Sequence, residues 1–237
     1  MAQKGQPVAT MQKKAAEAYK SEKYEEATAL YHKLNKQGES ADVCYNLGNS
    51  YFRQNDIANS ILWYERALLL DPSDEDVRAN LMFVQTKTVD KIVSEEDIFF
   101  VRWYKSILIS QSITTWIVCG MLFFALFMAC ALLYLFSQEI VMRKIGFFGS
   151  VIVLLLCLLV NSFAWSQHKM QTVRNRAVVM ETAVTVKSTP SDSGTDLFLL
   201  HAGTTMSILD SSIPGWAQIR LSNDKEGWIP VSAIEKI

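Results

Sequence analysis

Hydrophobic and polar positions divide the chain into three regions with different patterns. Residues 10–92 are mostly polar, and their apolar residues return at the spacing of helices. Residues 113–136 and 145–165 are continuous apolar runs, whereas residues 177–237 alternate between apolar and polar positions as strands do. The pattern predicts a multidomain membrane protein with an all-α domain, a two-helix transmembrane hairpin and a small all-β barrel.

The two apolar runs are long enough to cross a membrane. As helices, residues 113–136 would extend about 36 Å and residues 145–165 about 31 Å, whereas the hydrocarbon core is about 30 Å thick. Neither run contains Asp, Glu, Lys or Arg. Two core helices of a soluble protein would need a surrounding shell, and the rest of the chain is too small to provide one. Interfacial aromatic residues stand near the ends of the runs: Trp116, Tyr134, Phe147, Phe148 and Trp165.

Both ends of the hairpin are predicted to lie on one side of the membrane, because the short segment 137–144 joins two crossings. Upstream, residues 97–108 mix aromatic and basic side chains, which is typical of a helix in the headgroup region. The distribution of basic residues does not decide on which side of the membrane the termini lie. The joining segment carries Arg143 and Lys144 in close succession. The outer flanks carry more basic residues over longer segments, namely Arg102, Lys105, Lys169, Arg174 and Arg176.

Residues 44–72 have the spacing of two antiparallel helices in close contact. Small residues let the helices approach, and tyrosines fill the seam between them. The residues that carry the pattern are Leu47, Gly48, Tyr51, Ser60, Tyr64, Ala67 and the terminating Pro72. This pattern resembles the tetratricopeptide repeat, with Cys44 and Ser60 in place of the usual Trp and Ala.

A weaker copy of the pattern precedes this repeat by 33 residues, at positions 15–34. After Pro72, an acidic first turn and the apolar residues Leu81 and Val84 predict a capping helix. The sequence therefore predicts a tetratricopeptide-repeat domain over residues 10–92, built from two repeats and a cap.

The resemblance implies a role for the first helix of each pair. Arrays of these repeats bind peptides or partner proteins in a groove formed by those helices. The partner-binding positions that the resemblance carries over are Tyr19, Lys20, Tyr45, Asn49, Phe52 and Arg53. Neither Asn49 nor Arg53 is expected at a helix-packing position. The alternative interpretation is that all six are ordinary solvated helix residues.

Residues 177–237 contain turn-forming clusters between period-two segments, and five short strands in this length fit a small barrel. The residues that resemble the bacterial SH3 domain are Leu200, Ala202, Gly203, Gly215, Trp216, Ile219, Leu221 and the closing Gly-Trp-Ile-Pro at 227–230. The Asn-Val-Arg motif of that family is replaced at Val186–Ser188, so its ligand-facing Arg is absent. Trp216 and Trp228 are candidate ligand contacts; alternatively, they are core and strand-closing aromatics.

Motifs and charge indicate a protein that is not an enzyme. The chain has no phosphate-binding glycine loop, nucleophile elbow or zinc-protease motif, and its three histidines fall in separate segments. We therefore expect no catalytic residues, no metal site and no cofactor. Cys44 is the only cysteine outside the apolar runs, so no disulfide framework is expected. Residues 1–105 carry 14 basic and 16 acidic side chains and residues 177–237 carry 4 and 7, which excludes a nucleic-acid binder.

The order of repeats, hairpin and SH3-like barrel resembles the BatE-type proteins of the Bat aerotolerance cluster. Residues 45–84 carry the strongest part of this resemblance. It implies that the repeats face the periplasm behind a cleaved signal peptide. No apolar segment precedes Gln12, so the start Met-Ala-Gln is expected to follow a cleavage site.

Three functions are compared. The favoured one is a non-catalytic scaffold anchored in the bacterial inner membrane, with both termini periplasmic. Its repeats would bind a partner protein in an envelope complex linked to aerotolerance or stress. The alternative is an accessory to a cell-wall hydrolase, in which the barrel contacts murein (peptidoglycan). The third, an enzyme or transporter, has no residues to nominate, and no carboxylate lies within either span.

Overall fold

The structure is a computed structural model that describes residues 8–92 and 98–237 and divides them into two compact units. Unit 1 combines residues 8–92 with residues 174–237, and unit 2 contains residues 98–173. Residue 97, where the sequence predicts the interfacial helix to begin, lies outside the described residues. The two units are described separately.

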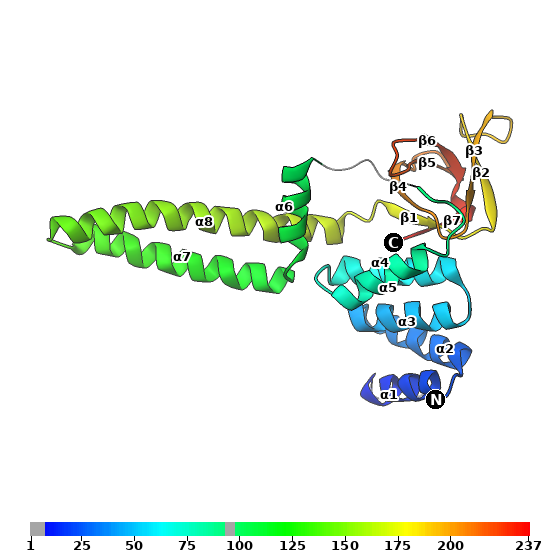
Figure 1. Cartoon of the computed structure of the whole chain (residues 1–237), viewed down its shortest axis with the longest axis horizontal. Helices are drawn as coiled ribbons and strands as arrows, with labels where there is room; N and C mark the ends of the chain where they lie inside the picture. The colour runs from blue at the N-terminus through cyan, green and yellow to red at the C-terminus, as the bar shows by residue number, and fades with distance from the viewer. Residues whose placement is uncertain (1–7, 93–97) are drawn as a thin grey trace. The chain divides into compact units, whose positions relative to one another are not determined.

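Five helices of unit 1 stack in chain order (Figure 1). They are α1 (Val8–Lys20), α2 (Tyr24–Asn35), α3 (Ala41–Arg53), α4 (Ile57–Leu70) and α5 (Glu75–Gln85). Helices α1 and α2 form one pair, α3 and α4 form a second, and α5 packs on α4. In the turn within each pair, Glu22 and Asn55 adopt positive φ angles of 61° and 62°. Because these residues are 33 positions apart, the weaker copy in the sequence is also a structural repeat.

Side-chain caps explain where three of these helices begin. In each case an oxygen of the N-cap residue accepts a hydrogen bond from the backbone N–H three residues later, which satisfies a donor that the helix itself leaves free. The caps are Ser40 for α3, Asp56 for α4 and Asp74 for α5. The acidic turn after Pro72 therefore starts a helix, as the sequence predicts.

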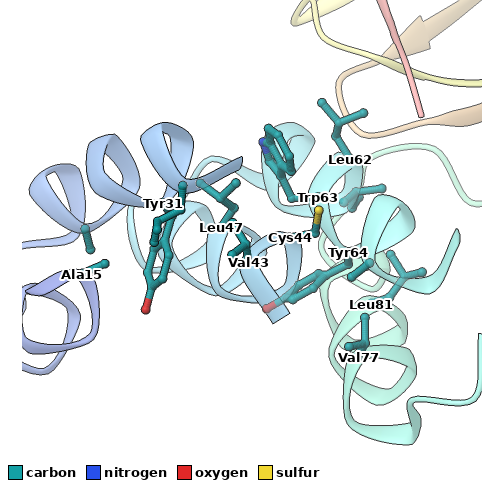
Figure 2. Close-up of a cluster of buried hydrophobic side chains, with 14 of the residues drawn as sticks. Ala15, Tyr31, Val43, Cys44, Leu47, Leu62, Trp63, Tyr64, Val77 and Leu81 are labelled. Atoms are coloured by element: carbon teal, nitrogen blue, oxygen red, sulfur yellow. The ribbon is translucent and has the colours of Figure 1, made fainter. Parts of the chain in front are cut away.

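One buried cluster runs through the helices (Figure 2). The figure shows Tyr31, Leu47, Trp63 and Tyr64 following one another across helices α2 to α4, with Val77 of α5 at one end. All five side chains are at most 5% exposed. The core therefore continues from the first pair to α5 without a break.

The C-terminal part of unit 1 is one antiparallel sheet of seven strands in the order β3-β2-β6-β5-β4-β1-β7. The strands are β1 (Arg176–Val179), β2 (Ala183–Lys187), β3 (Asp196–His201), β4 (Thr205–Asp210), β5 (Trp216–Arg220), β6 (Glu226–Pro230) and β7 (Ile234–Lys236). A 3₁₀ turn, Val231–Ala233, precedes β7. The sequence-based count of five strands is too low, because the short strands at the two ends of this region pair with each other.

Burial in the sheet follows period two in β5 and β6, where Ala217, Ile219 and Ile229 fill a core separate from that of the repeats. Strand β1 is different, because Ala177, Val178 and Val179 are all fully buried. Its two faces meet different partners: Ala177 and Val179 belong to the barrel core, whereas Val178 belongs to the repeat core. The barrel is therefore packed against the repeats through β1.

Unit 2 contains α6 (Phe99–Ile109) and two long apolar helices, α7 (Ile113–Phe136) and α8 (Ile140–Thr172) (Figure 1). Only residues 137–139 join the apolar helices, so the link is shorter than the predicted 137–144. Helix α8 is correspondingly longer than the predicted run 145–165, and it includes Arg143 and Lys144 in its first two turns.

Glycines bring the two apolar helices close together. A Cβ at Gly146 of α8 would lie 2.6 Å from the backbone nitrogen of Tyr134 and 2.9 Å from the carbonyl oxygen of Cys130 in α7. Helix α6 is tied to the other end of the pair, since the Tyr104 hydroxyl lies 2.9 Å from the Ser166 hydroxyl. Gln167 is buried there and donates to the carbonyl oxygen of Gln111 at 2.7 Å. The three helices therefore form one packed unit.

Candidate functional site

The first helix of each pair, together with α5, presents a group of aromatic, amide and basic side chains. We call this group the first-helix surface. Its members are Tyr19 from α1, Tyr45, Asn49, Phe52 and Arg53 from α3, and Asn80 and Phe83 from α5. Five of the six residues that the sequence nominates are in this group. The sixth, Lys20, is exposed at the end of α1.

On the α1 side, an arginine lies against tyrosines. The guanidinium carbon of Arg53 is 5.0 Å from the centre of the Tyr24 ring, and that ring meets Tyr19 edge to face at 5.4 Å. Burial raises the pKa of Tyr19, and the nearby Arg53 charge partly opposes this shift. Arg53 is exposed and forms no ion pair with a carboxylate in the part of the chain that the structure describes. Its guanidinium can therefore bind a carboxylate from outside.

On the α5 side, Asn49 has a structural role that the sequence does not reveal. The buried Tyr64 hydroxyl donates to Asn49 Oδ1 at 2.6 Å, and Asn80 Nδ2 donates to the Tyr45 hydroxyl at 3.1 Å. Burial raises the pKa of Tyr64, so this phenol stays protonated and needs an acceptor. The expectation that Asn49 lies outside helix packing is wrong, because its amide joins α3 to α4.

Two residues of this surface were missed in the sequence. Phe83 of α5 is 51% exposed, and its ring meets Phe52 edge to face at 5.7 Å. Asn80 contacts Tyr45, as described above. The usual repeat period of about 34 residues, added to Asn49, points to Phe83. Reading α5 as the first helix of an incomplete third repeat would therefore have located Phe83, whereas Asn80 is not one repeat period from any nominated residue.

Burial favours the neutral forms of two titratable side chains in the repeats, Cys44 and His32. Burial raises the pKa of the Cys44 thiol to about 12. Burial, together with the charges of Lys36 and Arg66, lowers the pKa of His32, whose Nε2 lies 2.7 Å from the Tyr51 hydroxyl. Within residues 8–92 and 98–237, no three His, Cys, Asp or Glu side chains are grouped as metal ligands. The first-helix surface is therefore suited to binding through polar and aromatic contacts.

In the barrel, the two candidate tryptophans lie on the sheet face opposite the core. They alternate with the buried Ala217 and Ile219 of β5 and the buried Ile229 of β6, and each indole is half-buried. Their strands are adjacent, with Trp216 opposite Pro230 and Trp228 opposite Gln218. Neither tryptophan therefore belongs to the barrel core, which leaves ligand contact and strand closure as the two interpretations.

Ion pairs flank these tryptophans. Lys187 of β2, opposite Trp228 in the register, is paired with Asp196 of β3. On the other side, Arg220 of β5 is paired with Glu226 of β6 at 2.6 Å. Indoles bordered by paired charges form a mixed apolar and polar strip on the outside of the sheet.

Comparison with known families assigns two segments of the chain. Residues 41–74 match the tetratricopeptide repeat, and residues 182–235 match the bacterial SH3 domain. No curated protein matches the chain. The first match covers the α3–α4 pair, and the second covers the sheet from the end of the β1–β2 connection to β7. The chain thus combines a tetratricopeptide-repeat region, two long apolar helices and a bacterial SH3-type barrel, and both matched families are non-catalytic binding domains.

Proposed function

We propose that the protein is a membrane-anchored scaffold whose first-helix surface binds a partner protein. The observation that supports this most directly is Arg53, an exposed cation beside tyrosine rings that no carboxylate of the described chain neutralises. Phe52, which precedes Arg53 in α3, and Phe83 of α5 supply apolar area on the same surface. The partner segment would combine a carboxylate with an apolar side chain.

Two substitutions separate binding from folding. Arg53→Ala should weaken capture of the partner about tenfold or more, because it removes a charge-assisted contact without disturbing the core. Asn49→Ala should lower the melting temperature, because the Tyr64 hydroxyl loses its acceptor. The assay is crosslinking in native membranes followed by purification of the full chain, with melting measured on the same samples. Lys33→Ala, an exposed cation of α2, is the control. Normal capture by Arg53→Ala would show that this surface does not select the partner.

The membrane anchor in this proposal is the α7–α8 pair. The helices have 24 and 33 residues, and their large apolar side chains face outward; Leu122 and Leu155, for example, are 66% and 62% exposed. Core helices of a soluble protein would be mostly buried. Lipid is the solvent in which such side chains are stable, and helices satisfy their backbone polar groups there. Helix α6, with Phe100 and Trp103 exposed, would lie in the headgroup region.

We place both termini in the periplasm and the short link in the cytoplasm. Arg143 and Lys144 stand in the first two turns of α8, next to the link, as the positive-inside rule favours for a cytoplasmic loop. Of the flanking cations, Arg174 and Arg176 pair with Glu39 and Glu65 inside unit 1. The resemblance to BatE-type proteins supports this side and a role in an envelope complex linked to aerotolerance. Protease added to intact spheroplasts should digest the repeats and barrel; digestion only after lysis would move them to the cytoplasm.

A second candidate function is contact with murein through the barrel, as an accessory to a wall hydrolase. It is favoured by the outward position of Trp216 and Trp228, which alternate with the core residues of their strands. The full chain in detergent should then sediment with purified sacculi, and Trp216→Ala together with Trp228→Ala should abolish sedimentation. Arg53→Ala should leave it unchanged. Absence of sedimentation by the unmodified chain would remove this candidate and leave the scaffold proposal intact.

A further inference from the structure

The barrel is attached to the repeats by a set of polar contacts between residues that are more than 100 positions apart in the chain. Arg176 of β1 donates to both carboxylate oxygens of Glu65 in α4, at 2.8 and 2.9 Å. The Glu65 side chain is only 6% exposed. A buried carboxylate is costly unless it is paired, so this two-bond contact specifies where β1 lies on α4.

A second polar contact holds the segment that follows α5. The carboxylate of Asp90 accepts hydrogen bonds from the backbone N–H of His201 at 2.7 Å and from the Thr204 hydroxyl at 2.6 Å, and it lies 2.8 Å from His201 Nδ1. Burial alone would raise the pKa of Asp90, but the hydrogen bonds from Thr204 and His201 lower it below its usual value. Asp90 is five residues beyond the end of α5, so the barrel anchors the chain where that helix ends.

Apolar contacts complete the attachment. Val178 of β1 and Ile237 are buried in the cluster of the repeats and lie outside that of the barrel. The turn before β4 also meets the repeats: at Gly203, with φ of 89°, an added Cβ would lie 3.1 Å from Ile61 Cδ1 and 3.0 Å from Thr88 Cγ2. This glycine allows both the positive φ and the close approach. The barrel therefore packs on α4 through close apolar contacts as well as through the ion pair.

The barrel is attached at the C-terminal end of the repeat array. Helix α5 packs on α4 as the first helix of a pair, but no second helix follows it within the described part of unit 1; the chain continues instead to Asp90 and the barrel contact. Stacked repeats bury their core only against neighbours, so a terminal unit must be capped. The first-helix surface depends on that cap, because Asn80 and Phe83 belong to α5.

We propose that the SH3-type barrel is bound in cis as the C-terminal cap of the repeat array, and that it holds α5 in place as one wall of the first-helix surface. The second half of this inference rests on the proposed partner binding, whereas the capping itself does not. Asp90 and Arg176 are positioning residues in this arrangement. A partner would find the complete surface only while the barrel is docked.

Hydrogen–deuterium exchange on the full chain in detergent tests the cap without any partner. Asp90→Ala and Arg176→Gln should each speed exchange of α5 and β1 amides by about tenfold or more, because each leaves buried polar groups unpaired. Exchange in α1 and in β5 should stay unchanged and shows that both domains remain folded. Arg220→Gln is the control, since it breaks an ion pair of the same barrel that does not touch the repeats.

The outcomes separate capping from partner binding. Unchanged exchange of α5 in both variants would overturn the inference, even if Arg53→Ala had abolished partner capture. Faster exchange of α5 would support the cap even if no partner were ever captured. Where partner capture is observed, it should fall in Asp90→Ala by the same factor by which the docked population falls; retained capture despite a loosened α5 would overturn the coupling to the first-helix surface.

Discussion

At the scale of single residues, Gly48 determines how closely the second helix pair can pack. A Cβ at this position would lie 2.6 Å from two ring carbons of Tyr64, which is itself 1% exposed and cannot move aside. The Ser60 hydroxyl donates to the Gly48 carbonyl oxygen at 2.9 Å across the same contact. The Leu-Gly pair of the repeat pattern is therefore required by the position of one buried ring.

Gly48→Ala should destabilise the repeats by about 1–3 kcal/mol, because overpacking against a fixed ring outweighs the gain in helix propensity. The control is Gly38→Ala, where an added Cβ meets nothing within 4 Å. That variant should change the unfolding free energy by no more than about 0.5 kcal/mol. Urea unfolding of the full chain in detergent, followed by circular dichroism, measures both. Equal stability of the two variants would contradict the packing explanation.

The same scale shows what the sequence can and cannot indicate. Periodicity identified Gly48 and Tyr64, because packing between paired helices repeats along the chain. It could not identify the role of Asn49, whose amide accepts from Tyr64 fifteen residues away. A helix pattern gives the direction of a side chain, but it does not give the hydrogen-bond partner that a neighbouring helix brings to it.

At the scale of elements, the apolar runs were located correctly but the length of α8 was not. The sequence pattern marks only residues that suit hydrocarbon, whereas a helix continues as long as its backbone hydrogen bonds do. Helix α8 therefore begins before the basic residues Arg143 and Lys144 and continues past Trp165 through the mostly polar residues 166–172. In the barrel, β1 pairs with β7, although the whole domain separates them in the chain. Turn-forming residues predict pairing only between neighbouring strands, so the sequence does not predict this pair.

The apolar pair offers a matched test of its packing. Gly146→Ala should disrupt the pair, because the new Cβ would meet backbone atoms of α7 at 2.6 and 2.9 Å. Gly149→Ala should be tolerated, since its Cβ would lie 3.4 Å from Cys130 Sγ, an ordinary contact. Both changes raise helix propensity equally, so their difference reports the clash alone. Unfolding of the full chain by SDS in mixed micelles should occur earlier in Gly146→Ala by about 1–3 kcal/mol; identical curves would argue against close packing of α7 and α8.

At the scale of the whole molecule, the contact between repeats and barrel is the feature that sequence reasoning missed entirely. Glu65, Asp90 and Arg176 each look like an ordinary surface charge in the sequence. Their partners are 111 positions away, and no spacing rule covers such a distance. Family patterns describe each domain separately, so they carry no information about a contact between two domains of different families.

For the proposed membrane anchor, this contact also constrains the topology. The repeats precede the apolar helices in the chain and the barrel follows them, yet the two domains share buried contacts in unit 1. They can meet only if the chain crosses the membrane an even number of times between them. Two crossings by α7 and α8 satisfy this condition, and a single crossing by either helix does not.

Cysteine labelling with a membrane-impermeant maleimide tests this requirement directly. Glu22→Cys in the α1–α2 turn and Asp224→Cys in the β5–β6 turn are both exposed, and they should label from the same side of sealed vesicles. Gln138→Cys in the link between α7 and α8 should label only from the opposite side. Arg53→Ala in the same background is a control for folding that should not alter labelling. Labelling of positions 22 and 224 from opposite sides would be incompatible with the docked barrel, because the Glu65–Arg176 pair could then not form within one chain.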